Sequence, residues 1–318
     1  LAPAMLAARN GNRTRILLYL FGIAGLTSQL ALARSYATDA TIATMADDET
    51  FQHLLVRVRG THDWIWAQGG ARNTPFGYLP RPLAGMRALL LDETAAEVTV
   101  AERPLEEDLR TVEVSVALRR DGGARVEVVE TQRGTFAAQW RNDLEEIPEE
   151  VLEQQFESQY VASFLPGGDL RRLSITGRDD PNGPLVLRYE VELGSLARET
   201  REGRVLPPLF RARLAPQFAS AASRTTTMLI ASGLALDVSV RVTLPEGATF
   251  PGAPGDVALS SVHGARMQQE SAAGARELTV RRSYRIPRMR VSPEDYAGFA
   301  RFCREADDAE AAEIRVRM

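Results

Sequence analysis

The stretch TVEVSVALRRDGGARVEVVET, residues 111–131, decides the fold class of this chain. Apolar and polar residues alternate in both halves, as they do in strands whose two faces meet different surroundings. The Asp-Gly-Gly sequence at 121–123, which separates the halves, is typical of a hairpin turn. We therefore predict two antiparallel strands joined by a tight connection.

A helical stretch follows the predicted hairpin. Apolar residues recur every four positions on both sides of Pro148, which interrupts a helix because it lacks a backbone N–H. Two helices that break at Pro148 and pack on a sheet are therefore expected, with further strands at 170–176 and 185–193. The apolar stripe consists of Phe136, Trp140, Leu144, Leu152, Phe156, Tyr160 and Phe164.

The polar and then proline-rich segment 198–208 predicts a domain boundary. Glycine- and proline-rich turns separate the strands beyond it, a spacing that favours an antiparallel, sandwich-like domain. Ser292 and Pro293 indicate the start of a closing helix, on which Cys303 packs as a small hydrophobic residue. The strands are expected at 226–231, 236–244, 257–262, 265–269 and 277–286.

The uncharged residues 16–33 allow two interpretations. Arginines before the run and Ala-Leu-Ala at its end resemble a secretory signal peptide, which would leave a secreted, β-rich binding protein after cleavage. The interruptions at Gly22, Gly25 and 27–29 favour a buried helix over 12–23 and a strand over 29–33. A transmembrane segment is not expected, because the strongly apolar part stops at Leu26.

Composition excludes several functions. The chain has 318 residues, 44% of them apolar, and a net charge of −4, which offers no basic field to a nucleic acid. Every basic residue is arginine, so a Schiff-base lysine and a phosphate loop ending in lysine are excluded. One cysteine and three scattered histidines make a metal site improbable on sequence grounds. We expect no metal and no cofactor.

The first 92 residues resemble the C-terminal half of a transglutaminase-like core, a papain-like fold that β-rich domains follow in bacterial envelope proteins. The resemblance rests on the apolar helix, the strand FQHLLVRV at 51–58, the Trp-containing strand at 64–66, and PFGYLP at 75–80 with the adjoining LAGMRALLLD. It implies an α+β chain with a partial transglutaminase-like core at 1–92. A helix-plus-sheet domain at 93–202 and a sandwich-like domain with a C-terminal helix at 203–318 would follow.

The same resemblance implies a catalytic Cys, His and Asp. Counting along the motifs places the Cys at Asn10, or nearer Arg13 when the glycine turn is the reference, while the His is His53. Trp66 stands where the Asp belongs. Neither an amide nor a guanidinium can attack a carbonyl carbon. The resemblance therefore predicts a pseudoenzyme in which His53 is vestigial.

Two functions follow from this pattern. The first is a non-catalytic binding or assembly module with a protein partner, placed in the periplasm or outside the cell by the resemblance alone. The second is a hydrolase or acyltransferase with relocated chemistry around His53, using Asp63 and a hydroxyl such as Ser28 or Thr14.

Other binding candidates are weaker. Trp64, in the segment that also holds His62, Asp63 and Trp66, could offer a sugar-stacking surface, and Tyr78 lies in the PFGYLP loop, although buried aromatic residues are commoner. Arg281 and Arg285 belong to an arginine-rich segment that could bind an anionic glycan, a lipid headgroup or the acidic helical segment at 142–157 of this chain. A solvated strand face is the simpler interpretation of those arginines.

Overall fold

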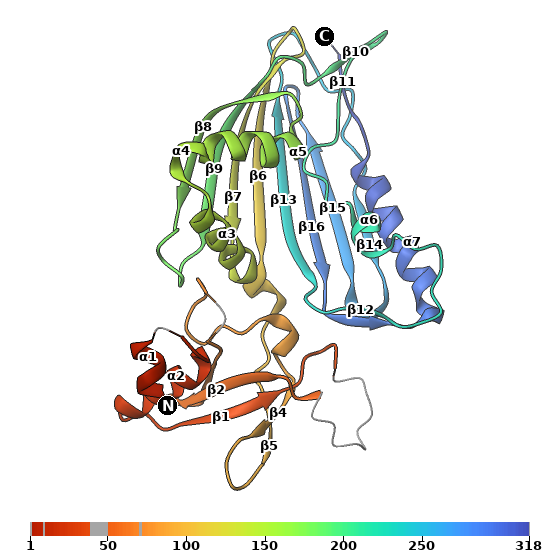
Figure 1. Cartoon of the computed structure of the whole chain (residues 1–318). Coiled ribbons are helices and arrows are strands. Elements are labelled where there is room, and N and C mark those ends of the chain that lie inside the picture. The colour runs from red at the N-terminus through yellow and green to blue at the C-terminus, as the bar shows by residue number, and fades with distance from the viewer. Residues whose placement is uncertain (1, 9, 39–49, 70–71, 318) are drawn as a thin grey trace. The chain divides into compact units, whose positions relative to one another are not determined.

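The computed structural model describes residues 2–8, 10–38, 50–69 and 72–317 (Figure 1). The chain divides into two compact units, Leu1–Glu107 (unit 1) and Asp108–Met318 (unit 2), which we describe separately. The fold is mixed α+β, as predicted, with several sheets and a long C-terminal helix. None of the helices in the described residues combines the length and hydrophobicity needed to cross a membrane.

Unit 1 is built on an antiparallel five-stranded sheet with the order β3-β2-β1-β4-β5. The helix α2 (Arg13–Ile23) packs against β1 and β2. The strands are β1 (Ser28–Ala33), β2 (His53–Arg59), β3 (Trp64–Ala67), β4 (Arg87–Leu90) and β5 (Glu97–Thr99). The remaining elements are α1 (Ala2–Ala7) and the short 3₁₀ helices η2 (Arg81–Leu83) and η3 (Leu105–Asp108), the last of which ends at the first residue of unit 2.

Local signals define the ends of α2. The Asn12 side chain accepts a hydrogen bond from the Arg15 N–H at 3.0 Å, which satisfies one free donor of the first turn. Gly25 follows the helix with φ +71°, a left-handed conformation that glycine adopts without strain. The helix and the strand expected over 12–33 are therefore confirmed, but the expected burial of the helix is wrong, since Leu20 and Ile23 are exposed. Thr14 is the fully buried residue of α2.

Unit 2 contains an eight-stranded sheet with the order β14-β15-β16-β13-β6-β7-β9-β8. All neighbouring pairs are antiparallel except β13 and β6, which run parallel. The first four strands in sequence are β6 (Arg110–Leu118), β7 (Ala124–Gln132), β8 (Gly168–Thr176) and β9 (Leu185–Leu193). The others are β13 (Leu234–Thr243), β14 (Val257–Ser260), β15 (Arg266–Ala273) and β16 (Glu277–Ile286).

The hairpin that decided the fold class is confirmed, because β6 and β7 pair across the turn through Arg119 N–H and the Gly123 carbonyl at 2.8 Å. The structure differs from the expected division near residue 203. Strands from both sides of that position join in one sheet, since β13 pairs with β6 along eight residue pairs. The segment 203–318 thus extends a shared sheet and does not form a separate sandwich.

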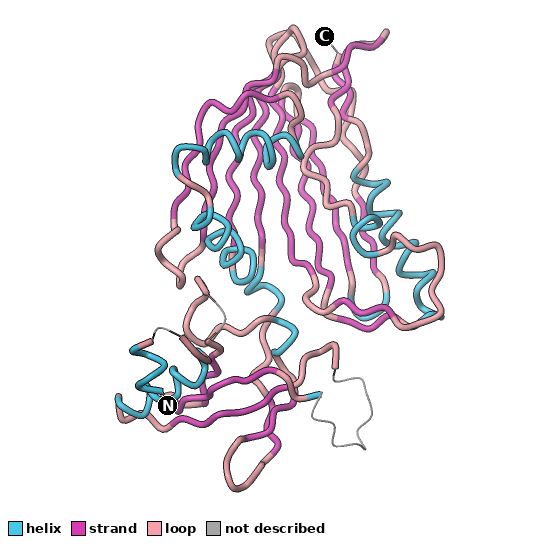
Figure 2. The backbone as a smooth tube through the Cα atoms, viewed as in Figure 1, coloured by secondary structure: helices cyan, strands magenta, loops and turns pink. Residues whose placement is uncertain are grey.

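Helices cover one face of this sheet (Figure 2). The predicted break at Pro148 separates α3 (Gly134–Glu146) from α4 (Glu149–Gln155), and a π-helical segment η4 (Phe156–Val161) leads into α5 (Ala162–Phe164). The second group is α6 (Leu214–Phe218) and α7 (Pro293–Glu310). Ser292 accepts from the Asp295 N–H at 3.1 Å, which confirms the predicted cap of α7.

Short elements complete unit 2. A three-stranded sheet consists of β10 (Arg198–Thr200), β11 (Gly203–Leu206) and β18 (Ile314–Val316). A two-stranded sheet joins β12 (Met228–Ile230) and β17 (Met289–Val291). The 3₁₀ helix η5 (Val262–Gly264) follows β14.

The core of unit 2 lies between the sheet and its helices. Alternate residues of the strands, such as Val114, Val126 and Val240, are buried, while their neighbours face solvent on the other side. Cys303 of α7 is 0% exposed in this core, so the prediction that it packs as a hydrophobic residue is confirmed.

A charged network lies inside the same core. The Glu130 carboxylate, at 0% exposure, accepts hydrogen bonds from Arg110 at 2.8 Å, from Tyr160 at 2.7 Å and from Tyr189 at 2.7 Å. The Gln132 amide donates to it at 3.0 Å. Burial lowers the pKa of Arg110, but the attraction and the hydrogen bond of Glu130, together with the nearby Tyr160 and Tyr189, leave that pKa raised. The buried Glu130 carboxylate therefore accepts hydrogen bonds from four side chains.

Candidate functional site

Three segments of unit 1 line an open cavity of about 490 Å³. The start of α2 contributes residues 11–14, the start of β2 contributes 52–54, and the chain that leaves β3 contributes 68 and 69. The cavity therefore brings His53 to the N-terminus of a helix, which is the layout that the transglutaminase-like resemblance implies.

Thr14 and Gly69 hold these segments together. The Thr14 hydroxyl donates to the Leu54 carbonyl at 3.5 Å and accepts from the Gly69 N–H at 3.1 Å. A Cβ atom on residue 69 would lie 2.5 Å from the backbone of Arg13 and of Thr14, which is closer than real Cβ contacts. Only glycine permits this approach of the β3 segment to the helix start.

His53 opens β2, where it lies opposite Ala33 of β1. The side chain is half-buried, and burial lowers its pKa because desolvation disfavours the charged imidazolium. The described residues that line the cavity include neither a thiol nor a carboxylate. Burial therefore favours the neutral form of His53, and among the described residues that line the cavity its imidazole meets neither a cysteine nucleophile nor an orienting carboxylate.

The structure distinguishes the two positions considered for the missing cysteine. Arg13 is the first residue of α2 and lines the cavity with His53. Asn10 is exposed, outside the cavity lining, and its N–H donates to the Met5 carbonyl. Of the two residues, Arg13 is therefore the one that lies at the cavity.

Trp66 does not reach the cavity. It is 5% exposed and belongs to the core of unit 1, whereas Gln68, two residues later, lines the cavity. The β2–β3 register, continued one pair beyond Val56 and Ala67, sets Gln68 opposite Leu55 and beside His53. Strand alternation could have indicated this residue, because Trp66 and Gln68 share a face and the apolar one belongs in the core.

The residues proposed for relocated chemistry are separated. Ser28 pairs with Val58, five residues along β1 from the partner of His53, which is about 16 Å at 3.3 Å per residue. Asp63 precedes β3 at the far end of β2, and its carboxylate accepts from the Trp64 N–H at 2.7 Å. Thr14 is close, but its hydroxyl is engaged with Leu54 and Gly69.

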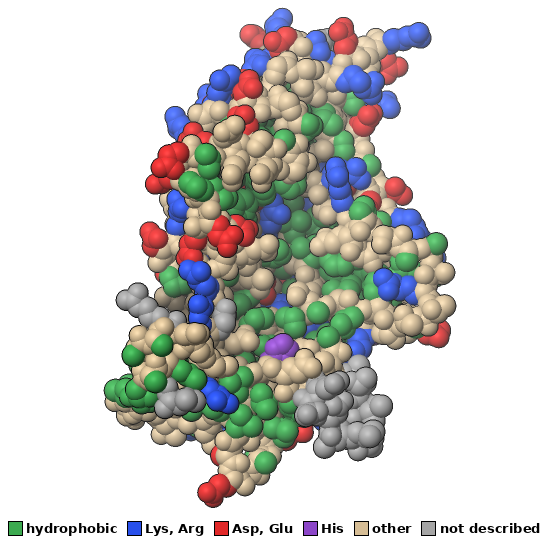
Figure 3. Space-filling model, viewed as in Figure 1, with side chains coloured by type: hydrophobic (Ala, Val, Ile, Leu, Met, Phe, Trp, Pro, Cys, Tyr) green, Lys and Arg blue, Asp and Glu red, His purple; other side chains and the backbone are tan. Residues whose placement is uncertain are grey.

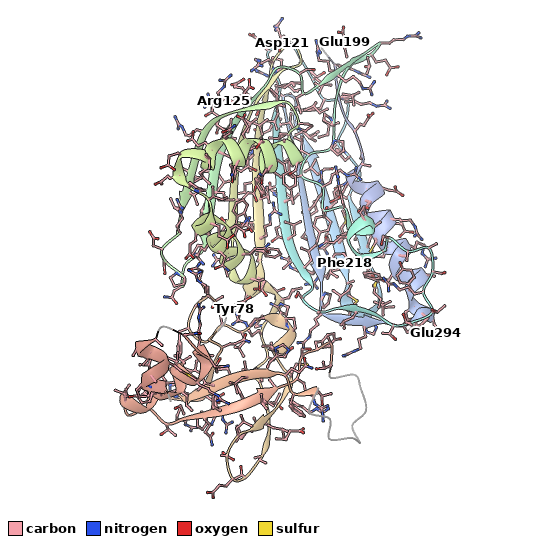
Figure 4. All side chains as sticks on the ribbon, in the orientation of Figure 1. Tyr78, Asp121, Arg125, Glu199, Phe218 and Glu294 are labelled. Carbon is pink, nitrogen blue, oxygen red and sulfur yellow. The ribbon has the colours of Figure 1, made fainter. Side chains whose placement is uncertain are left out.

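The two aromatic binding candidates are occupied by arginines. The Arg57 guanidinium lies 4.2 Å from the centre of the Trp64 ring, and the Gln29 side chain holds that guanidinium at 2.6 Å. Tyr78, labelled in Figure 4, is 4% exposed, with Arg103 at 4.1 Å from its ring centre. Both rings therefore make cation–π contacts within the chain.

Arg281 and Arg285 lie on the helix-free face of the large sheet, where they line a hollow of about 380 Å³. Two nitrogens of Arg285 contact the two oxygens of Asp237 at 2.7 and 3.1 Å, a forked geometry that fixes the guanidinium. Arg281 is exposed. Among the residues with described positions, no group of three or more side chains could hold a metal ion.

Comparisons with known proteins identify the architecture more than the activity. Residues 202–316 match a domain of unknown function, DUF3858. The crystal structure of a "putative protease" from Parabacteroides distasonis ATCC 8503 is similar over 100% of this chain, with a TM-score of 0.55 and 11% sequence identity. The chain spans 46% of that protein's length, and at this identity the similarity shows a shared fold. No curated protein matches the chain.

Proposed function

We propose that unit 1 is a transglutaminase-like lobe without its nucleophile, and that it acts as a non-catalytic binding module. The observation that carries this proposal is Arg13, which begins α2 in the same cavity as His53. A guanidinium stays protonated and cannot attack a carbonyl carbon. The fold shared with the Parabacteroides distasonis protein supports a protease-type scaffold, and the cavity lining supports the loss of cysteine chemistry.

The cavity is suited to bind a polypeptide. Asn12, Gln52 and Gln68 offer amides that donate and accept hydrogen bonds, and Arg13 adds a forked cation for a carboxylate or a backbone carbonyl. A protein partner in the bacterial envelope is the ligand that we propose, and a periplasmic or extracellular location is part of the same proposal. Its support is the family resemblance of the first 92 residues.

Activity measurements test the catalytic part of this proposal. The purified chain is incubated with a glutamine-containing peptide and a fluorescent primary amine, and separately with peptide substrates for hydrolysis. We expect incorporation and cleavage at the background rate, equal to that of His53→Ala. Reproducible turnover that disappears in His53→Ala would overturn the proposal.

A designed thiol tests the spatial assignment. In Arg13→Cys, the helix N-terminus and the His53 imidazole both favour the thiolate, so we expect alkylation by iodoacetamide near neutral pH to be about tenfold faster than at an exposed cysteine. Glu93→Cys, on an exposed turn, provides that reference, and the buried Cys303 stays unmodified. Equal rates in Arg13→Cys and in Arg13→Cys/His53→Ala would contradict the proximity of the two residues.

A further inference from the structure

The small sheet β10-β11-β18 of unit 2 lines a second cavity, of about 450 Å³. Figure 3 shows basic side chains grouped with acidic ones at the end of the unit that carries β10 and β11, and Figure 4 labels Glu199 of β10 there. The basic lining residues are Arg198, Arg201, Arg204, Arg315 and Arg317. This cavity belongs to neither the His53 site nor the hollow beside Arg285.

Strand register explains why the arginines converge. Arg198 and Arg315 both lie opposite Val205, from the two sides of β11, so the three side chains share one face of the sheet. Arg317, two residues after Arg315, falls on the same face. Its backbone is fixed by two hydrogen bonds of 2.9 Å with Thr249. The guanidinium groups therefore extend over a common floor that the small side chain of Val205 leaves open.

The positive charge of the cavity is only partly neutralised. Glu202 and Glu313 are the acidic lining residues, and Glu313 lies 3.5 Å from Arg198 in an exposed pair, which is a weak interaction. In the described part of the chain, Arg201, Arg315 and Arg317 make no ion pair with a carboxylate. A chain with a net charge of −4 thus concentrates unpaired cations in one cavity.

We propose that this cavity binds a ligand that carries phosphate groups. Guanidinium forks match phosphate oxygens, and a tetrahedral phosphate can accept from forks that approach from several strands at once. A planar carboxylate offers two oxygens in one plane and suits this arrangement less well. The volume is within the range of small-molecule sites, so the cavity has room for a ligand larger than a single phosphate ion.

Calorimetric titration of the full chain with inorganic pyrophosphate tests the proposal. We expect binding that weakens with salt, and a loss of at least about tenfold in affinity for Arg315→Ala/Arg317→Ala, since each fork contributes charge-assisted hydrogen bonds. The control Arg241→Ala/Arg301→Ala removes the same charge from exposed residues outside the cavity, and we expect it to bind as the wild type does. Arg201→Ala, in the turn after β10, provides a second variant if the double variant unfolds.

Two further arms identify the source of the phosphate. Vesicles of phosphatidylglycerol, compared with phosphatidylcholine, test a lipid headgroup, and competition by pyrophosphate would assign the headgroup to this cavity. Binding of pyrophosphate without vesicle binding would assign a soluble phosphorylated ligand, and both results support the proposal. Absence of pyrophosphate binding, equal affinity for citrate, or an equal loss in the control variant would overturn it.

Discussion

At the scale of single residues, Gly69 controls whether the His53 cavity exists. Its hydrogen on Cα occupies the place where any other residue would put a carbon atom against the first turn of α2. The glycine therefore permits close contact between two segments distant in sequence, and Thr14 then bonds to Leu54 of β2 and to Gly69 itself. The cavity therefore depends on the absence of a side chain at residue 69.

Two alanine substitutions test this role with opposite signs. Gly69→Ala should lower the free energy of unfolding of unit 1 by about 1–3 kcal/mol, because the new Cβ forces the helix start away. Gly22→Ala, inside α2 with nothing within 4 Å of the added carbon, should raise it by about 0.5–1 kcal/mol. Urea unfolding curves provide the measurement, and destabilisation by both changes would contradict the steric argument.

The pKa of His53 tests whether residue 68 lies beside its imidazole. Burial lowers the pKa of His53, so the unfolded chain takes up a proton first and stability falls as the pH drops below about 6.5. In Gln68→Asp a carboxylate beside the imidazole should raise that pKa. The His53 ring resonances, followed by NMR against pH, measure the change. Asp63→Asn, at the remote end of β2, is the control and should leave the titration unchanged.

At the scale of elements, the Glu130 network attaches η4 to the sheet. The Tyr160 hydroxyl of η4 donates to Glu130 on β7 and accepts from Arg110 on β6 at 2.8 Å. The tilted and edge contacts of Tyr160 with Trp140 and Phe156 add apolar packing around these bonds. The π-helical turn of η4 thus lies at the point where the Tyr160 hydroxyl reaches the buried Glu130 carboxylate.

Substitutions of Glu130 and of Tyr160 distinguish the contribution of the buried ion pair from that of one hydroxyl hydrogen bond. Glu130→Ala leaves the Arg110 guanidinium without its partner and should lower the free energy of unfolding of unit 2 by about 3–5 kcal/mol. Tyr160→Phe keeps the ring and removes one hydroxyl, so a loss of about 1–3 kcal/mol is expected. Thermal unfolding followed by circular dichroism compares the variants, and a milder effect of Glu130→Ala than of Tyr160→Phe would contradict this order.

Elements set by local chemistry were predictable from sequence. The hairpin of β6 and β7, the break at Pro148 and the Ser292 cap each depend on a few neighbouring residues. The parallel pairing of β13 with β6 was not predictable, because no local pattern states which distant strand will be a neighbour. His53 was found from its strand, and alternation from Trp66 indicates the face of Gln68, but only the β2–β3 pairing shows that Gln68 lies beside His53.

At the scale of the whole molecule, buried thiol and phenol groups with raised pKa values lower the stability of the fold at alkaline pH. Burial raises the pKa of the Cys303 thiol from 9.0 to about 12. Burial, reinforced by the nearby carboxylates Glu130 and Glu310, also raises the pKa of Tyr160, Tyr189 and Tyr284 well above 10. The folded chain keeps these protons while the unfolded chain releases them.

The free energy of unfolding should therefore fall as the pH rises above about 9 and continue to fall through pH 11. Midpoints of urea unfolding between pH 7 and pH 11 measure this trend. Tyr189→Phe should flatten the alkaline slope, since it removes one group whose proton uptake differs between the two states. An alkaline slope that is unchanged in Tyr189→Phe would contradict this origin.

The parallel junction between β13 and β6 has a consequence for how this molecule can be divided. The segment that matches DUF3858 begins at residue 202 and contains β13, but β6 lies before it. Excised alone, it would present the bare hydrogen-bonding edge of a central strand, and such edges recruit other chains into aggregates. The matched segment and the β6–β7 hairpin before it therefore belong to one sheet, and a truncated or engineered variant should keep them together.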